Sequence, residues 1–104
     1  MGGDYDSMYP ELLNFFGAYF NQDFEEYGRT DEEIIRAYSR EQRPEKRRRV
    51  VANIDALLKN VQSEEQLRIA LDDFCTAYYL DPETEPAREW LERIRDLIKA
   101  TIDN

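Results

Sequence analysis

Paired carboxylates are the most frequent side chains in this chain that could carry out chemistry. Adjacent acidic residues occur at positions 25–26, 31–33, 64–65 and 72–73. Two carboxylates can serve as the general acid and base of a hydrolase, but neighbours on a helix point about 100° apart and make poor catalytic partners. The capping of helix starts explains 31–33 and 64–65. Asp72 and Asp73 are expected in mid-helix, where no cap needs them, and are better candidates for partner contact.

The single cysteine and the absence of histidine argue against nucleophilic and zinc chemistry. A cysteine nucleophile usually needs a histidine base and basic neighbours that favour the thiolate, but Cys75 follows Asp72, Asp73 and Phe74. We interpret Cys75 as a small buried hydrophobe in a reducing compartment. The sequence also lacks a glycine-rich phosphate loop and the ligand spacing of an EF-hand. We therefore expect no enzymatic activity, no cofactor, no metal and no small-molecule substrate.

The net charge of −9 is distributed unevenly over the 104 residues. Residues 1–33 carry nine acidic residues and one basic residue, residues 34–60 carry three and eight, and residues 61–104 carry eleven and five. A nucleic-acid-binding protein normally has the opposite net charge. An acidic domain suits a basic protein partner, which it attracts over a long range, although acidity can also serve solubility alone.

The basic run at residues 46–49 is the sharpest local charge feature. Such a run can contact phosphates or act as a targeting patch, but four successive side chains spread around a helix instead of forming one stripe. Acidic residues at 31–33 and in the C-terminal half can pair with it. We expect a solvated surface with internal ion pairs and no direct nucleic-acid binding.

Apolar spacing and capping signals predict five helices. The first runs from Pro10 to Asn21, and residues 23–29 follow it as a loop or short turn. The second opens at Thr30, with Glu33 at the spacing of a capping box, and ends before the next proline.

The last three predicted helices are long and amphipathic. The third runs from Pro44 to about Val61, the fourth follows Ser63 with an apolar face that reaches Tyr78, and the fifth begins near Pro86. This pattern and the low content of Gly and Pro (four each) predict an all-α fold, in which residues 1–104 form a single-domain compact bundle of about five helices. No apolar run approaches the roughly 18–20 residues of a membrane span, and the N-terminus lacks a signal-peptide pattern. We expect a cytoplasmic protein without membrane contact.

Aromatic residues lie among the acidic ones in two parts of the sequence. The six aromatics between positions 15 and 27 are too many for one helical face, so some are expected in the core and others on an acidic surface. Tyr78 and Tyr79 repeat this combination. Interfaces are enriched in such aromatics. The residues that we predict to contact a partner are Asp23, Glu25, Glu26, Tyr27, Asp31, Glu32, Asp72, Asp73, Tyr79 and Asp81.

Several blocks of the sequence resemble the immunity proteins of contact-dependent growth inhibition systems, the CdiI type. Residues 9–12 and 14–24 (YPEL and NFFGAYFNQDF) are similar to the family opening "YPEL…F…AYFHQDW", with Asn21 and Phe24 where His and Trp are common. Residues 27–33 fit the next block. Residues 78–82 and 88–91 (YYLDP and REWL) resemble the family ending, with Ala87 where Tyr is common.

The resemblance implies a small bacterial protein that binds and neutralises a cognate toxin domain, often a nuclease, as a heterodimer. Because each member protects against its own toxin, the motif residues are interpreted as structural and give no contact residues. An acidic helical protein could cover the basic active-site cleft of a nuclease. Two alternatives stay open: an inhibitor that acts away from the toxin active site, and a non-catalytic adaptor that binds another cellular protein through its basic run.

Overall fold

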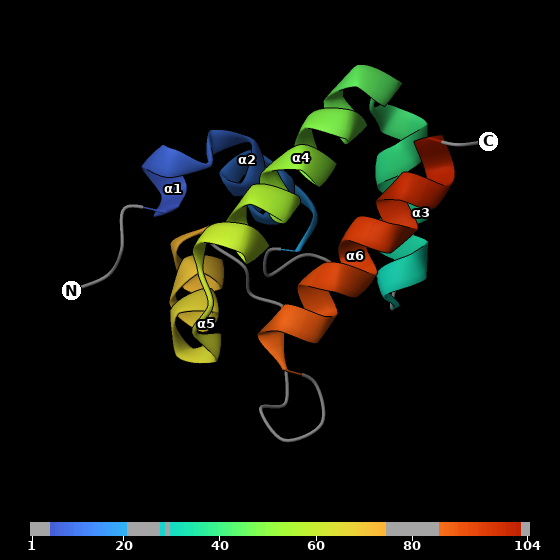
Figure 1. Cartoon of the computed structure of the whole chain (residues 1–104). Coiled ribbons are helices and arrows are strands. Elements are labelled where there is room, and N and C mark those ends of the chain that lie inside the picture. Colours follow the sequence, from blue (N-terminus) through green and yellow to red (C-terminus); the bar gives the residue numbers. More distant parts are fainter. Residues whose placement is uncertain (1–4, 21–27, 29, 75–85, 103–104) are drawn as a thin grey trace.

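The described part of the structure is built from helices. The computed structural model describes residues 5–20, 28, 30–74 and 86–102, and it contains no strand within these ranges. The helices are α1 (Tyr5–Met8), α2 (Pro10–Tyr19), α3 (Asp31–Glu41), α4 (Pro44–Asn60), α5 (Glu64–Asp73) and α6 (Ala87–Ile102) (Figure 1). The predicted all-α class is therefore confirmed. The four-residue α1 is an addition to the five predicted helices.

The two longest helices, α4 and α6, form the centre of the fold and run antiparallel. At one end the Arg47 guanidinium donates to the Thr101 carbonyl at 3.1 Å and to its hydroxyl at 2.9 Å. At the other end Arg88 donates to the carbonyls of Leu58 at 3.1 Å and Val61 at 2.6 Å. These carbonyls lie at the C-terminus of α4, where the helix leaves its last acceptors without internal partners. Each end of the pair is thus held by an arginine.

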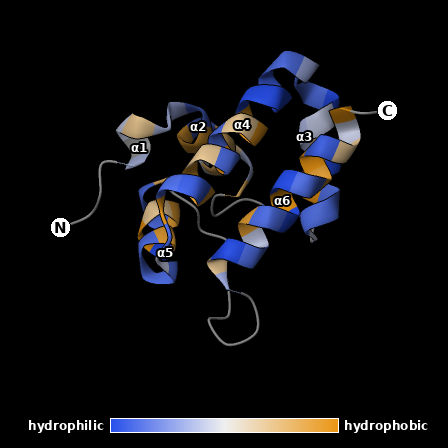
Figure 2. Ribbon diagram, in the orientation of Figure 1, coloured by the Kyte–Doolittle hydropathy of each residue, from blue (hydrophilic) through white to orange (hydrophobic). Residues whose placement is uncertain are grey.

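The remaining helices surround this central pair. Helices α2 and α4 pack together, α3 and α5 each contact α6, and α1 contacts both α2 and α5. In Figure 1, α3 and α5 lie on opposite sides of the α4–α6 pair. Hydrophobic and hydrophilic residues alternate along the helix ribbons (Figure 2), and the buried residues of the described ranges are apolar except for Asp31.

The predicted helix starts are present, but in each capping box the side chain of the third residue bonds to a group other than the cap N–H. The Thr30 hydroxyl accepts from the Glu33 N–H at 3.2 Å, and the Ser63 hydroxyl accepts from the Gln66 N–H at 3.3 Å. The reciprocal half of a capping box would return the Glu or Gln side chain to the cap N–H. Here the Glu33 carboxylate accepts from the Thr30 hydroxyl at 3.3 Å, and the Gln66 amide oxygen accepts from the Tyr5 hydroxyl at 2.9 Å. Gln66 thereby fastens α1 to α5.

Aromatic rings form the core beneath α4 and α6. Trp90 is completely buried, and its ring centroid lies 5.7 Å from that of Phe16 and 5.3 Å from that of Phe20. Phe15 and Tyr19 are buried as well, so every described aromatic of the first predicted aromatic group belongs to the core. Phe24 and Tyr27 of that group lie outside the described residues. The positions 15, 16, 19 and 20 share one side of α2 because they repeat at the helical spacing.

Tyr38 is buried in this core, and its hydroxyl group is buried together with the ring. Its side chain is 1% exposed, and no described residue makes a hydrogen bond to the hydroxyl. Burial, with smaller contributions from nearby Tyr19 and Glu11, raises the pKa of Tyr38 above its ordinary value, against an opposing effect of Arg47. The neutral phenol is therefore strongly favoured in the folded protein.

Candidate partner-binding surface

Four of the ten predicted contact residues lie in the part of the chain that the structure describes. They are Asp31, Glu32, Asp72 and Asp73. The other six lie outside the described residues: Asp23, Glu25, Glu26, Tyr27, Tyr79 and Asp81. Asp31 and Glu32 begin α3, and Asp72 and Asp73 end α5. Since α3 and α5 flank opposite sides of the α4–α6 pair (Figure 1), the two described pairs do not form one cluster.

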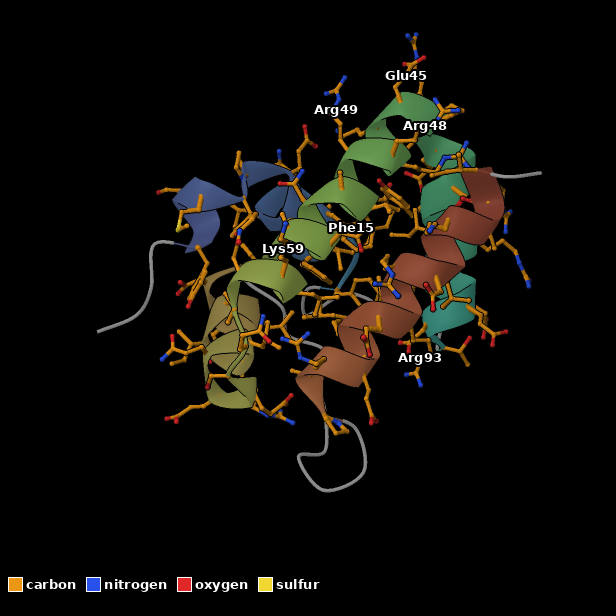
Figure 3. The ribbon with its side chains drawn as sticks, in the orientation of Figure 1. Phe15, Glu45, Arg48, Arg49, Lys59 and Arg93 are labelled. Atoms are coloured by element: carbon orange, nitrogen blue, oxygen red, sulfur yellow. The ribbon has the colours of Figure 1, made fainter. Side chains whose placement is uncertain are left out.

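Asp31 is the buried charged residue within the described ranges, and its carboxylate binds α6. The residue is 7% exposed. Its Oδ2 accepts from the Trp90 indole N–H at 3.2 Å and from the Arg93 guanidinium at 2.6 Å. The Arg93 side chain itself is about half exposed (52%), and Figure 3 shows it at the outer side of α6. These contacts give Asp31 a structural role, and partner contact through its carboxylate stays a prediction.

Glu32 has the surroundings of a contact residue. It is exposed at the second position of α3, and no described residue forms an ion pair with it. A carboxylate in the first turn of a helix is stabilised by the helix dipole. Glu32 is therefore tolerated here as a solvated charge that a basic partner could reach.

Asp72 and Asp73 lie at the end of α5, so the predicted mid-helix position was wrong. Phe74 is the C-cap, and its N–H bonds to the carbonyls of Ala70 and Asp72 in a tightened last turn. Carboxylates at a helix C-terminus are disfavoured by the dipole, and the last turn of α5 contains no basic residue. Asp72 is exposed, and one oxygen of the half-buried Asp73 has no hydrogen-bond partner among the described residues. This pair of charges does not stabilise the end of the helix, and it forms no ion pair within the described ranges.

Glu64 and Glu65 form the acidic pair at the start of α5, and Glu64 has a structural function. The Glu64 carboxylate accepts from the backbone N–H groups of Ala87 at 2.5 Å and Arg88 at 3.1 Å. These are the first N–H groups of α6, which have no acceptor within the helix. Glu64 also pairs with Arg68 at 3.2 Å. Glu65 is exposed. The prediction that these residues cap the start of their own helix does not describe the contacts of Glu64, whose carboxylate caps the following helix.

Most of the acidic excess belongs to segments outside the described residues. Of the 14 basic residues, 13 lie in the described ranges, against 15 of the 23 acidic residues. The two internal segments 21–27 and 75–85 hold six carboxylates and no basic residue. Both contain predicted contact residues. The charge that a basic partner would meet is therefore concentrated, along the sequence, in these segments and their neighbours.

The basic run at the start of α4 is spread around the helix, as predicted. Arg47 points to α6 and holds Thr101, whereas Arg48 and Arg49 point outward near the N-terminal end of α4 (Figure 3). Arg49 pairs with Glu11 of α2 at 3.5 Å. The expected ion pairs between this run and residues 31–33 or the C-terminal half are absent among the described residues. The contact to the C-terminal helix is made instead by a neutral threonine.

The described residues offer few features of an active site. They include no group of three or more Cys, Asp and Glu side chains placed to hold a metal ion. Cys75 lies outside the described residues. None of the helices in residues 5–20, 30–74 and 86–102 combines the length and the apolar character required to cross a bilayer.

Several of the residues that carry the family resemblance have structural roles in the described part of the chain. Leu12, Phe16, Trp90 and Leu91 are completely buried, and Arg88 caps the C-terminus of α4. The sequence blocks therefore record how α2 and α6 pack, as interpreted from the sequence. They contain little information about the partner.

Comparison with known proteins identifies the family. The sequence model of the CdiI immunity protein family matches residues 8–98, which extend from α1 into the last turns of α6. No curated protein sequence and no solved structure is significantly similar to the chain. Because the match spans most of the 104 residues and includes the buried residues of α2 and α6, the chain belongs to the CdiI immunity protein family.

Proposed function

We propose that this protein neutralises the toxin domain of a contact-dependent growth inhibition effector by binding it through an acidic surface, without turnover. Membership of the CdiI immunity protein family supports the binding of a cognate toxin. The observation that carries the acidic mechanism is the position of Asp72 and Asp73. Both carboxylates lie at the helix end where the dipole disfavours them, without an ion pair to a described residue. Such charges gain stabilisation when a cationic partner arrives.

A nuclease toxin is the partner that fits this surface. A nuclease binds a polyanion and therefore presents a basic cleft. An acidic protein that occupies the cleft competes with the substrate for the same cationic side chains and repels the substrate. Long-range attraction also accelerates the encounter, to rate constants of about 10⁸–10⁹ M⁻¹s⁻¹ at low salt in the best cases. Fast association suits an inhibitor that must intercept a toxin before the toxin acts.

The proposed contact regions are residues 23–33 and 72–85. Within them the described geometry favours Glu32, Asp72 and Asp73 over Asp31, because the Asp31 carboxylate already binds Trp90. The tyrosines of these regions would serve as anchors, since aromatic side chains bury a large area at a low entropic cost. We place the complex in the cytoplasm as a heterodimer of one immunity protein and one toxin domain.

The test is a charge-neutralising variant with a matched control. Asp72→Asn/Asp73→Asn removes two negative charges from the proposed surface, and Glu41→Gln/Glu45→Gln removes two exposed charges at the α3–α4 corner, far from α5. Affinity for the toxin domain of the effector encoded beside this gene is measured by calorimetry from low to high salt. We expect the α5 variant to bind roughly fivefold or more weakly, with a flatter salt dependence. The control should bind like the wild type.

Two results would contradict the proposal at different levels. Equal losses in both variants would show that only the net charge matters and that the α5 pair is not a contact. Absence of any interaction between the wild-type chain and the toxin domain would reject toxin binding itself. Circular dichroism of each variant verifies that the helices are retained.

A further inference from the structure

An open groove lies between α3, the start of α4 and the end of α6, away from the acidic residues of α5. Its volume is about 410 Å³. Three arginines line it, Arg36 and Arg40 from α3 and Arg47 from α4, around the apolar side chains of Ile35 and Leu97. We call it the arginine groove. The groove combines positively charged side chains with an apolar floor. A surface that contacts only water does not need this combination.

Two of these arginines have no ionic partner in the described part of the chain. Arg36 and Arg40 are exposed one turn apart on the same side of α3. Like charges at this spacing destabilise a helix by a few tenths of a kcal/mol. Glu32 lies one further turn toward the N-terminus at the rim of the groove, yet it forms no ion pair with Arg36. The groove therefore keeps two guanidinium groups available for an external anion.

The groove also contains buried donors without acceptors. The Ser39 hydroxyl and the Arg47 Nε are both buried, and neither has a hydrogen-bond partner among the described residues. Buried donors are normally satisfied, because an unpaired one costs about 1–3 kcal/mol. The Arg47 guanidinium is fixed by its two bonds to Thr101, so it does not need to be ordered when a ligand binds. Acceptor oxygens of a ligand would satisfy the exposed guanidinium groups of Arg36 and Arg40, whereas the two buried donors lie beneath the groove surface.

We propose that the arginine groove binds an acidic segment of the toxin domain, with an aliphatic side chain against Ile35 and Leu97 and carboxylates on Arg36 and Arg40. This inference rests on the proposed function and adds a second contact of the opposite sign. A protein segment fits better than a nucleic acid for two reasons. The apolar floor matches an aliphatic side chain, and the net charge of −9 repels an extended polyanion far more than it repels two carboxylates.

A contact of opposite sign would fix the orientation of the complex. The groove lies along α3, with the proposed acidic contact Glu32 at its rim, and the other described acidic contacts, Asp72 and Asp73, lie at the end of α5 on the other side of the α4–α6 pair (Figure 1). Protein surfaces normally carry charges of both signs, so a toxin with a basic cleft also has acidic patches. When two regions of opposite sign each meet their complement, only one docking register satisfies both.

The groove and simple long-range attraction predict opposite effects of an Arg→Glu substitution on the affinity for the toxin domain, and the test uses this difference. If attraction between an acidic inhibitor and a basic toxin were the only interaction, any Arg→Glu change would strengthen binding. The groove instead predicts that Arg36→Glu/Arg40→Glu weakens toxin binding by about tenfold or more, a loss typical of charge pairs at a protein interface. The control Arg48→Glu/Lys59→Glu makes the same charge change at exposed residues outside the groove (Figure 3). It should bind as tightly as the wild type or more tightly.

The outcomes separate this inference from the proposed function. If the wild type binds the toxin domain and Arg36→Glu/Arg40→Glu binds it equally or more tightly, the groove is not a contact site. Toxin binding itself would still stand. An equal loss in both double variants would also overturn it. A fluorescein-labelled 20-nucleotide RNA serves as the probe for the other class of ligand. Tight binding of this RNA to the wild type, abolished in the groove variant, would reassign the groove to nucleic acid and contradict the proposal. Circular dichroism verifies folding in every case.

Discussion

Substitution of Asp31 by alanine should destabilise the protein much more than the same substitution of its neighbour Glu32. Asp31 is buried and its Oδ2 accepts from both Trp90 and Arg93 of α6. Glu32 is exposed, and no described residue pairs with it. Both residues lie in the first turn of α3 and have the same favourable interaction with the helix dipole. The comparison therefore isolates the contacts between α3 and α6.

The expected loss follows from three contributions. The 3.2 Å bond from the Trp90 indole to a charged acceptor contributes about 1.5 kcal/mol, because its removal leaves a buried N–H unpaired. The Arg93 ion pair, with Arg93 half exposed, is screened by solvent and contributes about 0.5–1 kcal/mol. The dipole adds about 0.5 kcal/mol. Asp31→Ala should thus cost about 2.5–3 kcal/mol, against about 0.5 kcal/mol for Glu32→Ala.

Trp90 makes this prediction convenient to measure. It is the only tryptophan of the chain and is completely buried beside Asp31. Urea unfolding is followed by tryptophan fluorescence, and far-ultraviolet circular dichroism provides an independent signal for the helices. For a domain of this size the calculated loss lowers the melting temperature by about 10–15 °C. Asp31→Asn, which can still accept from the indole, should lose about 1 kcal/mol.

Urea midpoints of Asp31→Ala and Glu32→Ala that agree within error would show that the Asp31 contacts to α6 do not stabilise the fold. Asp31 would then be an exposed charge like its neighbour. A selective loss of toxin affinity without a loss of stability would assign Asp31 to the partner instead.

Three further predictions concern other parts of the fold. Glu64→Ala should cost about 1–2 kcal/mol, because two N–H groups at the start of α6 lose their acceptor, whereas Glu65→Ala should cost less than about 0.5 kcal/mol in the same urea titration. Tyr38→Phe should be about 1 kcal/mol more stable than the wild type at neutral pH, since its buried hydroxyl has no described partner. The raised pKa of Tyr38 in the folded state means that only the unfolded chain releases this proton above pH 10, so the wild type should lose about 1.4 kcal/mol per pH unit relative to Tyr38→Phe there and show no such slope below pH 9. Gly28→Ala should destabilise by more than about 1 kcal/mol, because the added Cβ would collide with the Glu33 side chain at the start of α3; an unchanged melting temperature would contradict this.

Helix starts were predictable because their signals are local. Thr30, Pro44 and Ser63 each act within one turn of their own helix, and the structure places helix starts at all three. Apolar periodicity likewise predicted the buried faces of α4 and α6. The short α1 has too few residues to show any periodicity, and it was not predicted.

Contacts between distant residues were not predictable from the sequence. Nothing local distinguishes Asp31 from Glu32, and the difference arises because Trp90 reaches one and not the other. The same holds for Glu64, whose carboxylate caps a helix that begins 23 residues later. The arginine groove also required the fold, because it joins arginines of α3 and α4 to a floor that α6 completes.

From the charge pattern we predict a basic partner, but the pattern does not determine which residues contact it. The net charge and the acidic segments are properties of the composition. The exposure of each carboxylate depends on packing, which buries Asp31 and leaves Asp72 in solvent. Immunity specificity therefore has to be sought among exposed residues outside the buried family motif.

Toxin neutralisation is measured by titrating the purified toxin domain with this protein while the proposed nuclease activity of the toxin is followed. We expect the activity to fall to zero at one equivalent of immunity protein at low salt and the inhibition to weaken progressively as salt is added. Full toxin activity in the presence of an excess of folded immunity protein would contradict it, as would inhibition that is insensitive to salt.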